Sequence, residues 1–399
     1  MLTLKSLLLT LLLGSALLLT PTACRHADSP DSAVPTPARV LVNSSLIGKY
    51  SKGDLQSNYS GLGSVFKLLI NYGISVYKIE YNTTNTDGKT IRASGALIVP
   101  DNSGAMPLLS FQHGTTPGND GAPSNFAGGS EANQFGSVFA SQGYIISIPD
   151  YIGLGVSNNL PQTYEQRNGL ATSCLDMLRA SREFLLDNRV NWNGRLFLAG
   201  YSEGGYATMA LQKKIEEETG SEFNLVASSL GAGAYDKTDF MNYIINQKSS
   251  GVADFNKNYI WVLLTYDRIY GLNRPMSYYF KEPYATQIAR DGRNAEVGVS
   301  LNETFTDQFR QGIQNGTDTA FIKAVADNDI YDWKPNVPTR LYHGDADNLV
   351  PFFNSQNAYN AMQKRGAPNV QLFPQKGLDH FTGVVPFITG TYTFFTSIQ

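Results

Sequence analysis

Residues Leu198–Gln212 read LAGYSEGGYATMALQ and place one serine between glycines, where an apolar run gives way to a helical pattern. The preceding residues, RLF, extend the apolar run, and Gly205–Thr219 has the period of a helix. Glycine loses more backbone entropy on folding than other residues, so this cluster indicates a local requirement. The pattern G-x-S-x-G between a strand and a helix predicts a tight turn that exposes the hydroxyl of Ser202. For the pentapeptide alone, a glycine-rich turn with a capping serine is the simpler interpretation.

Short apolar runs bounded by turn residues recur along the chain: MPLLSFQHG, YIISIPD, LVASSLGAG, TRLYHGD and VQLFPQ. Such runs suit strands that are buried on both faces of a sheet. Helical patterns such as Tyr164–Asp187 lie between them, and repeated strand, helix, strand order predicts right-handed crossovers. Alternation around Asp87-Gly88 predicts a hairpin over Val76–Pro100 at the edge of the sheet. The expected fold class is α/β, with helices on both faces of a mostly parallel sheet.

The regular order of strands and helices breaks between Ala234 and Pro335, in a stretch rich in aromatic residues. A long excursion between two core strands is better interpreted as a mainly helical cap than as a loop. The predicted organisation is a signal peptide at 1–23, a tether at 24–42, the first part of the core at 43–234, the cap at 235–335 and the second part of the core at 336–399.

The amino terminus has the features of an export signal. Lys5 precedes the leucine-rich run 7–19, small residues follow, and the run is too short for a comfortable membrane span. Cys24 stands where a lipoprotein signal places its acylated cysteine, although simple cleavage near Ala23 is an alternative because Pro21 is a poor match to that signal. The only other cysteine, Cys174, lies in a helical pattern and is expected to pack as a small buried hydrophobe. We therefore expect an exported protein that is secreted, periplasmic or anchored through a lipid on Cys24.

Composition argues against a nucleic-acid partner. The formal net charge is −3, and the sequence contains no long run of lysine or arginine. This balance favours a small-molecule or neutral substrate. The chain lacks a phosphate-binding loop, and its GLG run lacks the third glycine of a dinucleotide fingerprint, so no cofactor is implied.

A serine nucleophile needs a histidine base, and only four histidines exist. His26 is in the tether, His113 and His343 end predicted strands, and His380 follows the last strand, where a base late in the chain is expected. His343 is the competitor, but a side chain at the end of its own strand more often packs or bonds locally. The base in turn needs a carboxylate.

The loop YHGDADNLVP offers two carboxylates, of which Asp347 is the candidate acid and Asp345 is expected to fix the turn. Asp379, beside His380, would point away from it in an extended loop. A calcium site is not expected from this loop, because it lacks the third oxygen ligand and the turn glycine of an EF-hand. No metal site is therefore predicted.

An acyl-transfer site also needs donors for an oxyanion. The N–H of Glu203, the residue after Ser202, is one candidate. The second is Thr115 in the glycine-rich loop after SFQHG, which could offer an N–H and a hydroxyl; an ordinary polar loop is the simpler interpretation.

These motifs, with IISIPDYIGLG, DNDIYDWKPNVP and a late GLDHFTG, resemble the α/β-hydrolase superfamily over roughly Ser75 to the C-terminus. More narrowly, the chain is similar to secretory lipases of the Candida antarctica lipase A type and to related bacterial exported esterases. The resemblance implies a triad of Ser202, Asp347 and His380 and a cap over an acyl tunnel. Those fungal lipases carry an aspartate at the position of Thr115, and disulfides that this chain cannot form.

The expected activity is hydrolysis of small-molecule or lipid carboxylic esters through an acyl-enzyme. A serine peptidase on the same scaffold and a non-catalytic binding module are the alternatives, because one fold carries several functions.

Overall fold

The computed structural model describes residues 38–57, 67–116 and 118–398. The predicted signal peptide and Cys24 therefore lie outside the described residues. Residues Arg39–Gln399 form one compact unit that contains both predicted parts of the core and the predicted cap.

The strands are β1 (Leu41–Tyr50), β2 (Ile74–Thr84), β3 (Thr90–Pro100), β4 (Met106–Gln112), β5 (Ile145–Pro149), β6 (Trp192–Tyr201), β7 (Asn224–Gly231), β8 (Thr339–Gly344) and β9 (Val370–Gln375). The helices are α1 (Lys52–Ser57), α3 (Ser137–Ser141), α4 (Arg167–Asp187), α5 (Glu203–Glu218), α6 (Lys237–Asn246), α7 (Ala253–Ile269), α8 (Met276–Tyr279), α9 (Tyr284–Asp291), α10 (Leu301–Thr304), α11 (Asp307–Gln314), α12 (Thr319–Ala326), α13 (Phe353–Lys364) and α14 (Val384–Thr396).

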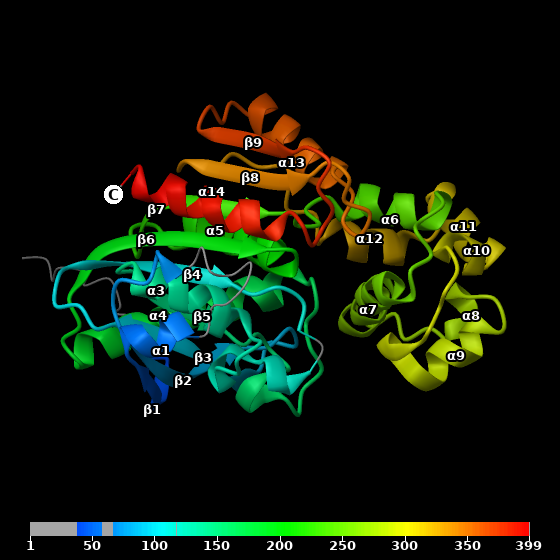
Figure 1. The fold of residues 1–399 in the computed structure, drawn as a ribbon. Coiled ribbons are helices and arrows are strands. Elements are labelled where there is room, and N and C mark those ends of the chain that lie inside the picture. Colours follow the sequence, from blue (N-terminus) through cyan, green and yellow to red (C-terminus); the bar gives the residue numbers. More distant parts are fainter. Residues whose placement is uncertain (1–37, 58–66, 117, 399) are drawn as a thin grey trace, which may run out of the picture. The chain divides into compact units, whose positions relative to one another are not determined.

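The strands of the described residues form one sheet in the order β1-β2-β3-β5-β4-β6-β7-β8-β9 (Figure 1). The pairs β1/β2, β2/β3 and β3/β5 are antiparallel, and every pair from β5/β4 to β8/β9 is parallel. The mostly parallel α/β fold expected from the sequence is confirmed, and each of its predicted apolar runs is a strand.

Alternation along the central strands builds a core on each face of the sheet. In β6, Leu196 and Leu198 pack with α4, α5 and α13, whereas Phe197 and Ala199 pack with α3 and α14 on the opposite face. All four side chains are fully buried, so the apolar run has no polar side to expose. Cys174 is free and buried in α4, as its helical pattern predicts.

The predicted hairpin is present as β2 and β3, and Gly88 in its turn has a φ of +81°. Its predicted place at the sheet edge is wrong, because β1 pairs with the outer side of β2. The side chains of β1 are mostly exposed, so no buried face marks this strand in the sequence. Its first residues are instead fixed by Glu183, whose carboxylate accepts the N–H groups of Val40 and Leu41 at 3.1 and 2.7 Å.

The chain between β7 and β8 is helical from α6 to α12, and this range, described throughout, contains no strand of the sheet. Its apolar side chains form a cluster separate from the two cores of the sheet, with Tyr266, Tyr279 and Phe309 completely buried. Leu349 and Val350, from the loop after β8, join the same cluster. The helical segment is thus packed against the end of the sheet where the predicted site residues lie.

Candidate active site

The turn between β6 and α5 holds Ser202 in a backbone conformation that few non-glycine residues adopt. Its φ is 60° and its ψ is −124°. The glycines around it are required by close approach of the main chain. A Cβ at Gly200 would lie 2.3 Å from the carbonyl oxygen of Gly204, and a Cβ at Gly204 would lie 2.0 Å from the carbonyl oxygen of Gln112. At Gly205 a Cβ would meet the carbonyl oxygen of Gly231 at 2.2 Å.

A hydrogen-bond relay joins Ser202, His380 and Asp347, which are far apart in the sequence. His380 Nε2 lies 2.8 Å from Ser202 Oγ, and His380 Nδ1 lies 2.6 Å from Asp347 Oδ2. Because an ionised carboxylate can only accept, Nδ1 carries the proton and Nε2 is left to accept from the serine hydroxyl. The carboxyl ends of the parallel strands β6 and β8 and the loop after β9 bring the three together at one edge of the sheet.

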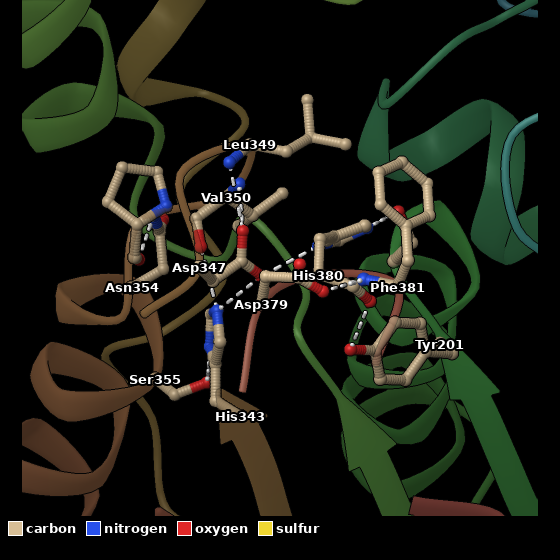
Figure 2. Close-up of polar contacts among 12 residues, drawn as sticks. Tyr201, His343, Asp347, Leu349, Val350, Asn354, Ser355, Asp379, His380 and Phe381 are labelled. Carbon is tan, nitrogen blue, oxygen red and sulfur yellow. Dashed lines mark hydrogen bonds and ion pairs between the residues drawn. The ribbon is translucent and has the colours of Figure 1, made fainter. Parts of the chain in front are cut away.

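Asp347 is buried and accepts hydrogen bonds from several sides (Figure 2). Its Oδ1 accepts the N–H groups of Leu349 and Val350 at 2.9 and 2.8 Å. His343 Nε2 approaches Oδ2 to 3.2 Å on the side away from His380. Burial opposes ionisation of the carboxyl, but the hydrogen bonds from His343 and His380 outweigh it and lower the pKa of Asp347. The acid of the relay is therefore held as a carboxylate.

His343 is a buried neighbour of Asp347, and the sequence analysis considered it as a competing base. Its Nε2 faces two acceptors, the carbonyl of Val350 at 2.7 Å and Asp347, so this nitrogen carries the proton. Its Nδ1 is 2.7 Å from the hydroxyl of Ser355, which donates to it. The strand end did predict local hydrogen bonding, but the sequence has no signal for the contact with Asp347.

The other two acidic candidates shape loops. Asp345 Oδ1 accepts the N–H of Gly377 at 2.6 Å. The carboxylate of Asp379 accepts the N–H groups of Phe381 and Thr382 at 3.0 and 2.8 Å. The imidazole of His380 is instead hydrogen-bonded to Asp347 and Ser202.

The loop that carries His380 is fastened to the strand that carries Ser202. The hydroxyl of Tyr201 donates to the carbonyl of His380 at 2.8 Å. The loop also passes so close to the end of β8 that a Cβ at Gly344 would lie 2.2 Å from the carbonyl oxygen of Leu378. Contacts with the ends of β6 and β8 thereby hold the loop that carries the imidazole.

The two predicted oxyanion donors come from the start of α5 and from the loop after β4. Glu203 is the first residue of α5, so its N–H is outside the hydrogen-bond ladder of the helix. Thr115 follows β4, and its Oγ1 is 2.9 Å from the hydroxyl of Tyr164. Gly114 links this loop to the nucleophile, because a Cβ built on it would lie 3.9 Å from Ser202 Cβ.

Ser202 opens on a largely apolar pocket whose walls come mainly from the helical segment between β7 and β8. The lining includes Phe240, Ile244, Leu263, Phe280, Leu301 and Phe305, with Leu349 and Val350 beside the acid loop. The rings of Phe280 and Phe305 are stacked with centroids 5.1 Å apart. Such a lining suits a hydrocarbon chain.

The pocket also has a charged wall that the sequence did not predict. Lys237 and Glu165 are both buried and form an ion pair there. Burial lowers the pKa of Lys237, whereas Glu165 raises it. Burial also raises the pKa of Glu203 well above its ordinary value, and the charge of Glu165 adds to that effect.

Within residues 38–57, 67–116 and 118–398, no group of three or more histidine, cysteine, aspartate or glutamate side chains is arranged to hold a metal ion. In the same part of the chain, no helix combines the length and apolar character that crossing a membrane requires.

With this geometry established, similarity to known proteins identifies the family. A model of the secretory lipase family matches residues 135–393. The chain belongs to the secretory lipase family. The resemblance inferred from the motifs is thus confirmed. Among individual proteins, Lipase 10 of Candida albicans is similar to the chain and is 26% identical over 271 residues. That alignment covers 60% of this chain and 53% of Lipase 10, so the chain spans about half the length of this relative.

Solved structures share the fold of this secretory lipase family member. A protein from Legionella pneumophila superposes with a TM-score of 0.78 at 23% identity, covering 90% of this chain and 98% of the other. A ligand-bound form of the rice cell wall degrading esterase LipA from Xanthomonas oryzae gives 0.77 at 24% identity, covering 91% and 100%. Candida antarctica lipase A gives 0.62 at 15% identity, covering 88% and 82%.

Proposed function

We propose that this protein is an exported serine hydrolase that cleaves carboxylic esters through an acyl-enzyme. The observation that carries the proposal is the relay from Ser202 through His380 to Asp347, with hydrogen bonds of 2.8 and 2.6 Å. Its position beside an apolar pocket and its occurrence in a secretory lipase family member support ester chemistry.

In the first half-reaction Ser202 Oγ attacks the ester carbonyl while His380 Nε2 takes the hydroxyl proton. Asp347 keeps the imidazole in the correct tautomer and stabilises its positive charge. As the tetrahedral intermediate collapses, the same proton passes to the departing alcohol. The acyl group is then bound to Ser202 as an ester.

In the second half-reaction water repeats these steps on the acyl-enzyme, with His380 again as the base. The carboxylic acid leaves, and Ser202 regains its proton. In both halves the N–H groups of Glu203 and Thr115 stabilise the oxyanion, and the amino-terminal end of α5 adds a favourable dipole.

The substrate class follows from the pocket. An acyl chain fits against Phe240, Leu263 and the Phe280–Phe305 stack, so esters with an apolar acyl part are the preferred substrates. Small-molecule esters and lipid esters both meet this requirement.

The test replaces Ser202 with alanine and compares it with Ser221→Ala, a change in an exposed loop. Both variants and the native protein are assayed with p-nitrophenyl esters of increasing acyl length and with aminoacyl anilides. Loss of ester turnover in Ser202→Ala alone supports the proposal. Anilide turnover without ester turnover would make the protein a peptidase, and failure of a fluorophosphonate probe to label the native protein would favour a non-catalytic binding module.

Export is part of the proposal and rests on the leucine-rich run 7–19 and on membership of a secretory family. Anchoring through Cys24 is tested by expression with a radiolabelled or alkyne-tagged fatty acid. Label in the native protein and its loss in Cys24→Ser support the anchor. Release of unlabelled protein cleaved near Ala23 contradicts it.

A further inference from the structure

The loop that carries Thr115 is held by two successive peptide groups with different anchors. In the peptide between Gly114 and Thr115, the carbonyl of Gly114 accepts from His113 Nδ1 at 2.7 Å. A trans peptide points its N–H opposite to its carbonyl, so the N–H of Thr115 is directed away from His113. This N–H has no acceptor among the described residues, which leaves it available to a substrate.

The preceding peptide, between His113 and Gly114, is fastened at both ends. Its carbonyl accepts from the hydroxyl of Tyr151 at 2.9 Å, and its N–H donates to Glu131 Oε1 at 3.1 Å. Since the peptide plane is rigid, these two contacts fix the orientation from which the next peptide begins. Glu131 lies just before the helical turn Ala132–Gly136, whereas Tyr151 follows β5.

Gly114 lies close to both the carboxyl group of Glu131 and the nucleophile. A Cβ on Gly114 would lie 2.9 Å from Glu131 Oε1 and 3.9 Å from Ser202 Cβ. The glycine is therefore enclosed between the carboxyl group and the nucleophile. A displacement of Glu131 would be transmitted through one residue to the oxyanion position.

The burial of the Glu131 carboxyl is energetically unfavourable. Its Oε2 is buried and has no hydrogen-bond partner among the described residues. Burial raises the pKa of Glu131 to about 7, and the hydrogen bond from Gly114 only partly offsets this. Buried polar atoms are nearly always paired, so an enclosed carboxyl with one partner requires an explanation.

We propose that Glu131 is a positioning residue for the oxyanion loop, where its hydrogen bond to Gly114 sets the direction of the Thr115 N–H toward the oxygen on the carbonyl attacked by Ser202. This inference rests on the proposed function. Glu131 does not touch the substrate, and its effect passes through two peptide planes. Its loss therefore weakens stabilisation of the transition state and leaves ground-state binding of the acyl chain unchanged.

The experiment compares Glu131→Ala, Glu131→Gln and the control Ser130→Ala. The control removes a neighbouring cap, in which Ser130 Oγ accepts the N–H of Asn133 at 3.3 Å, without touching Gly114. Removing a whole oxyanion donor costs about 10²- to 10³-fold in kcat, so misdirecting one should cost Glu131→Ala about 10- to 100-fold. KM should stay within about twofold, and Glu131→Gln, which keeps an acceptor oxygen, should recover most of the loss.

Several results would overturn the inference: an unchanged kcat in Glu131→Ala, an equal loss in Ser130→Ala, or a rise in KM at constant kcat. If Glu131→Ala does not fold, Glu131→Asp replaces it, because the shorter side chain keeps the acid but withdraws it from Gly114. An unchanged kcat in folded Glu131→Asp then overturns the inference.

Labelling by a fluorophosphonate separates this inference from the proposed function, since the reaction needs the nucleophile and the oxyanion site but no ester turnover. If the native protein hydrolyses esters and Glu131→Ala matches it, only the inference fails. If the native protein hydrolyses no ester, the proposed function fails, and slower labelling of Glu131→Ala than of Ser130→Ala still supports the inference. A native protein that is not labelled overturns both.

Discussion

Replacing Asp347 with asparagine tests the relay at its most constrained point. The amide oxygen can keep the N–H groups of Leu349 and Val350, which now lie 2.9 and 2.8 Å from Oδ1. The amide nitrogen then faces His380 at the position where the carboxylate oxygen lies 2.6 Å away. An NH₂ group can only donate, so His380 must turn an unprotonated Nδ1 toward it and carry its proton on Nε2.

The magnitude follows from that tautomer. With a proton already on Nε2, His380 cannot accept from Ser202, across the 2.8 Å contact that now joins them. The same exchange of tautomers costs a Ser-His-Asp triad about 10⁴-fold in kcat, or about 5.5 kcal/mol. The new NH₂ group also faces the protonated Nε2 of His343, which now lies 3.2 Å from Oδ2, but this nitrogen keeps its hydrogen bond to the carbonyl of Val350 at 2.7 Å, so the variant should fold.

The assay measures kcat with a short-chain p-nitrophenyl ester, alongside the melting temperature. Asp345→Asn is the matched control, because Asp345 binds the N–H of Gly377 and not the imidazole. It should keep nearly all of the activity. A folded Asp347→Asn protein with kcat within about tenfold of the native value would refute the assignment of Asp347.

Three further predictions concern charge and shape. Burial raises the pKa of Glu131 from 4.5 to about 7. Between these two pH values the carboxyl stays protonated in the folded chain but is ionised in the unfolded chain. The free energy of unfolding should therefore fall as pH rises through this range, by up to about 3 kcal/mol. Melting curves of Glu131→Gln should lack this fall, and identical pH dependence would contradict the burial argument. Lys237→Met should lower the free energy of unfolding, measured by denaturant titration, by about 3–5 kcal/mol because Glu165 is left buried and unpaired. The double variant with Glu165→Gln should recover much of this loss. No recovery would mean that lost packing, and not the unpaired charge, destabilises the variant. Phe305→Ala removes one ring of the Phe280–Phe305 stack from the pocket wall and should raise kcat/KM for long p-nitrophenyl esters relative to short ones; an unchanged ratio would contradict an acyl chain at this wall.

The strands that could be predicted from the sequence are those whose side chains are buried on both faces of the sheet. Runs such as RLFLAG have no polar face to hide, and each became a strand of the parallel part of the sheet. The strand Leu41–Tyr50 could not be found in this way, because its side chains are mostly exposed and its pairing with β2 is made by the main chain. The position of β1 outside the hairpin therefore has no signal in the sequence.

The candidate site was predictable from chain order and loop position for Ser202, Asp347 and His380, whose roles stay a prediction. The groups that support them carry no such signal. His343 contacts Asp347 because the loop after β8 turns back over the end of that strand, and Glu131 lies 17 positions after Gly114 in the sequence. The pairing of Glu165 with Lys237 joins segments 72 residues apart, which no local pattern encodes.

The glycines around Ser202 restrict which substitutions this sequence can accept. The atoms that a methyl group would strike at positions 200, 204 and 205 include the main-chain oxygens of Gly204, Gln112 and Gly231. A second-site substitution can shorten a side chain, but it cannot remove a carbonyl. We therefore expect no neutral substitution at these three positions, so related sequences should keep glycine there and vary elsewhere.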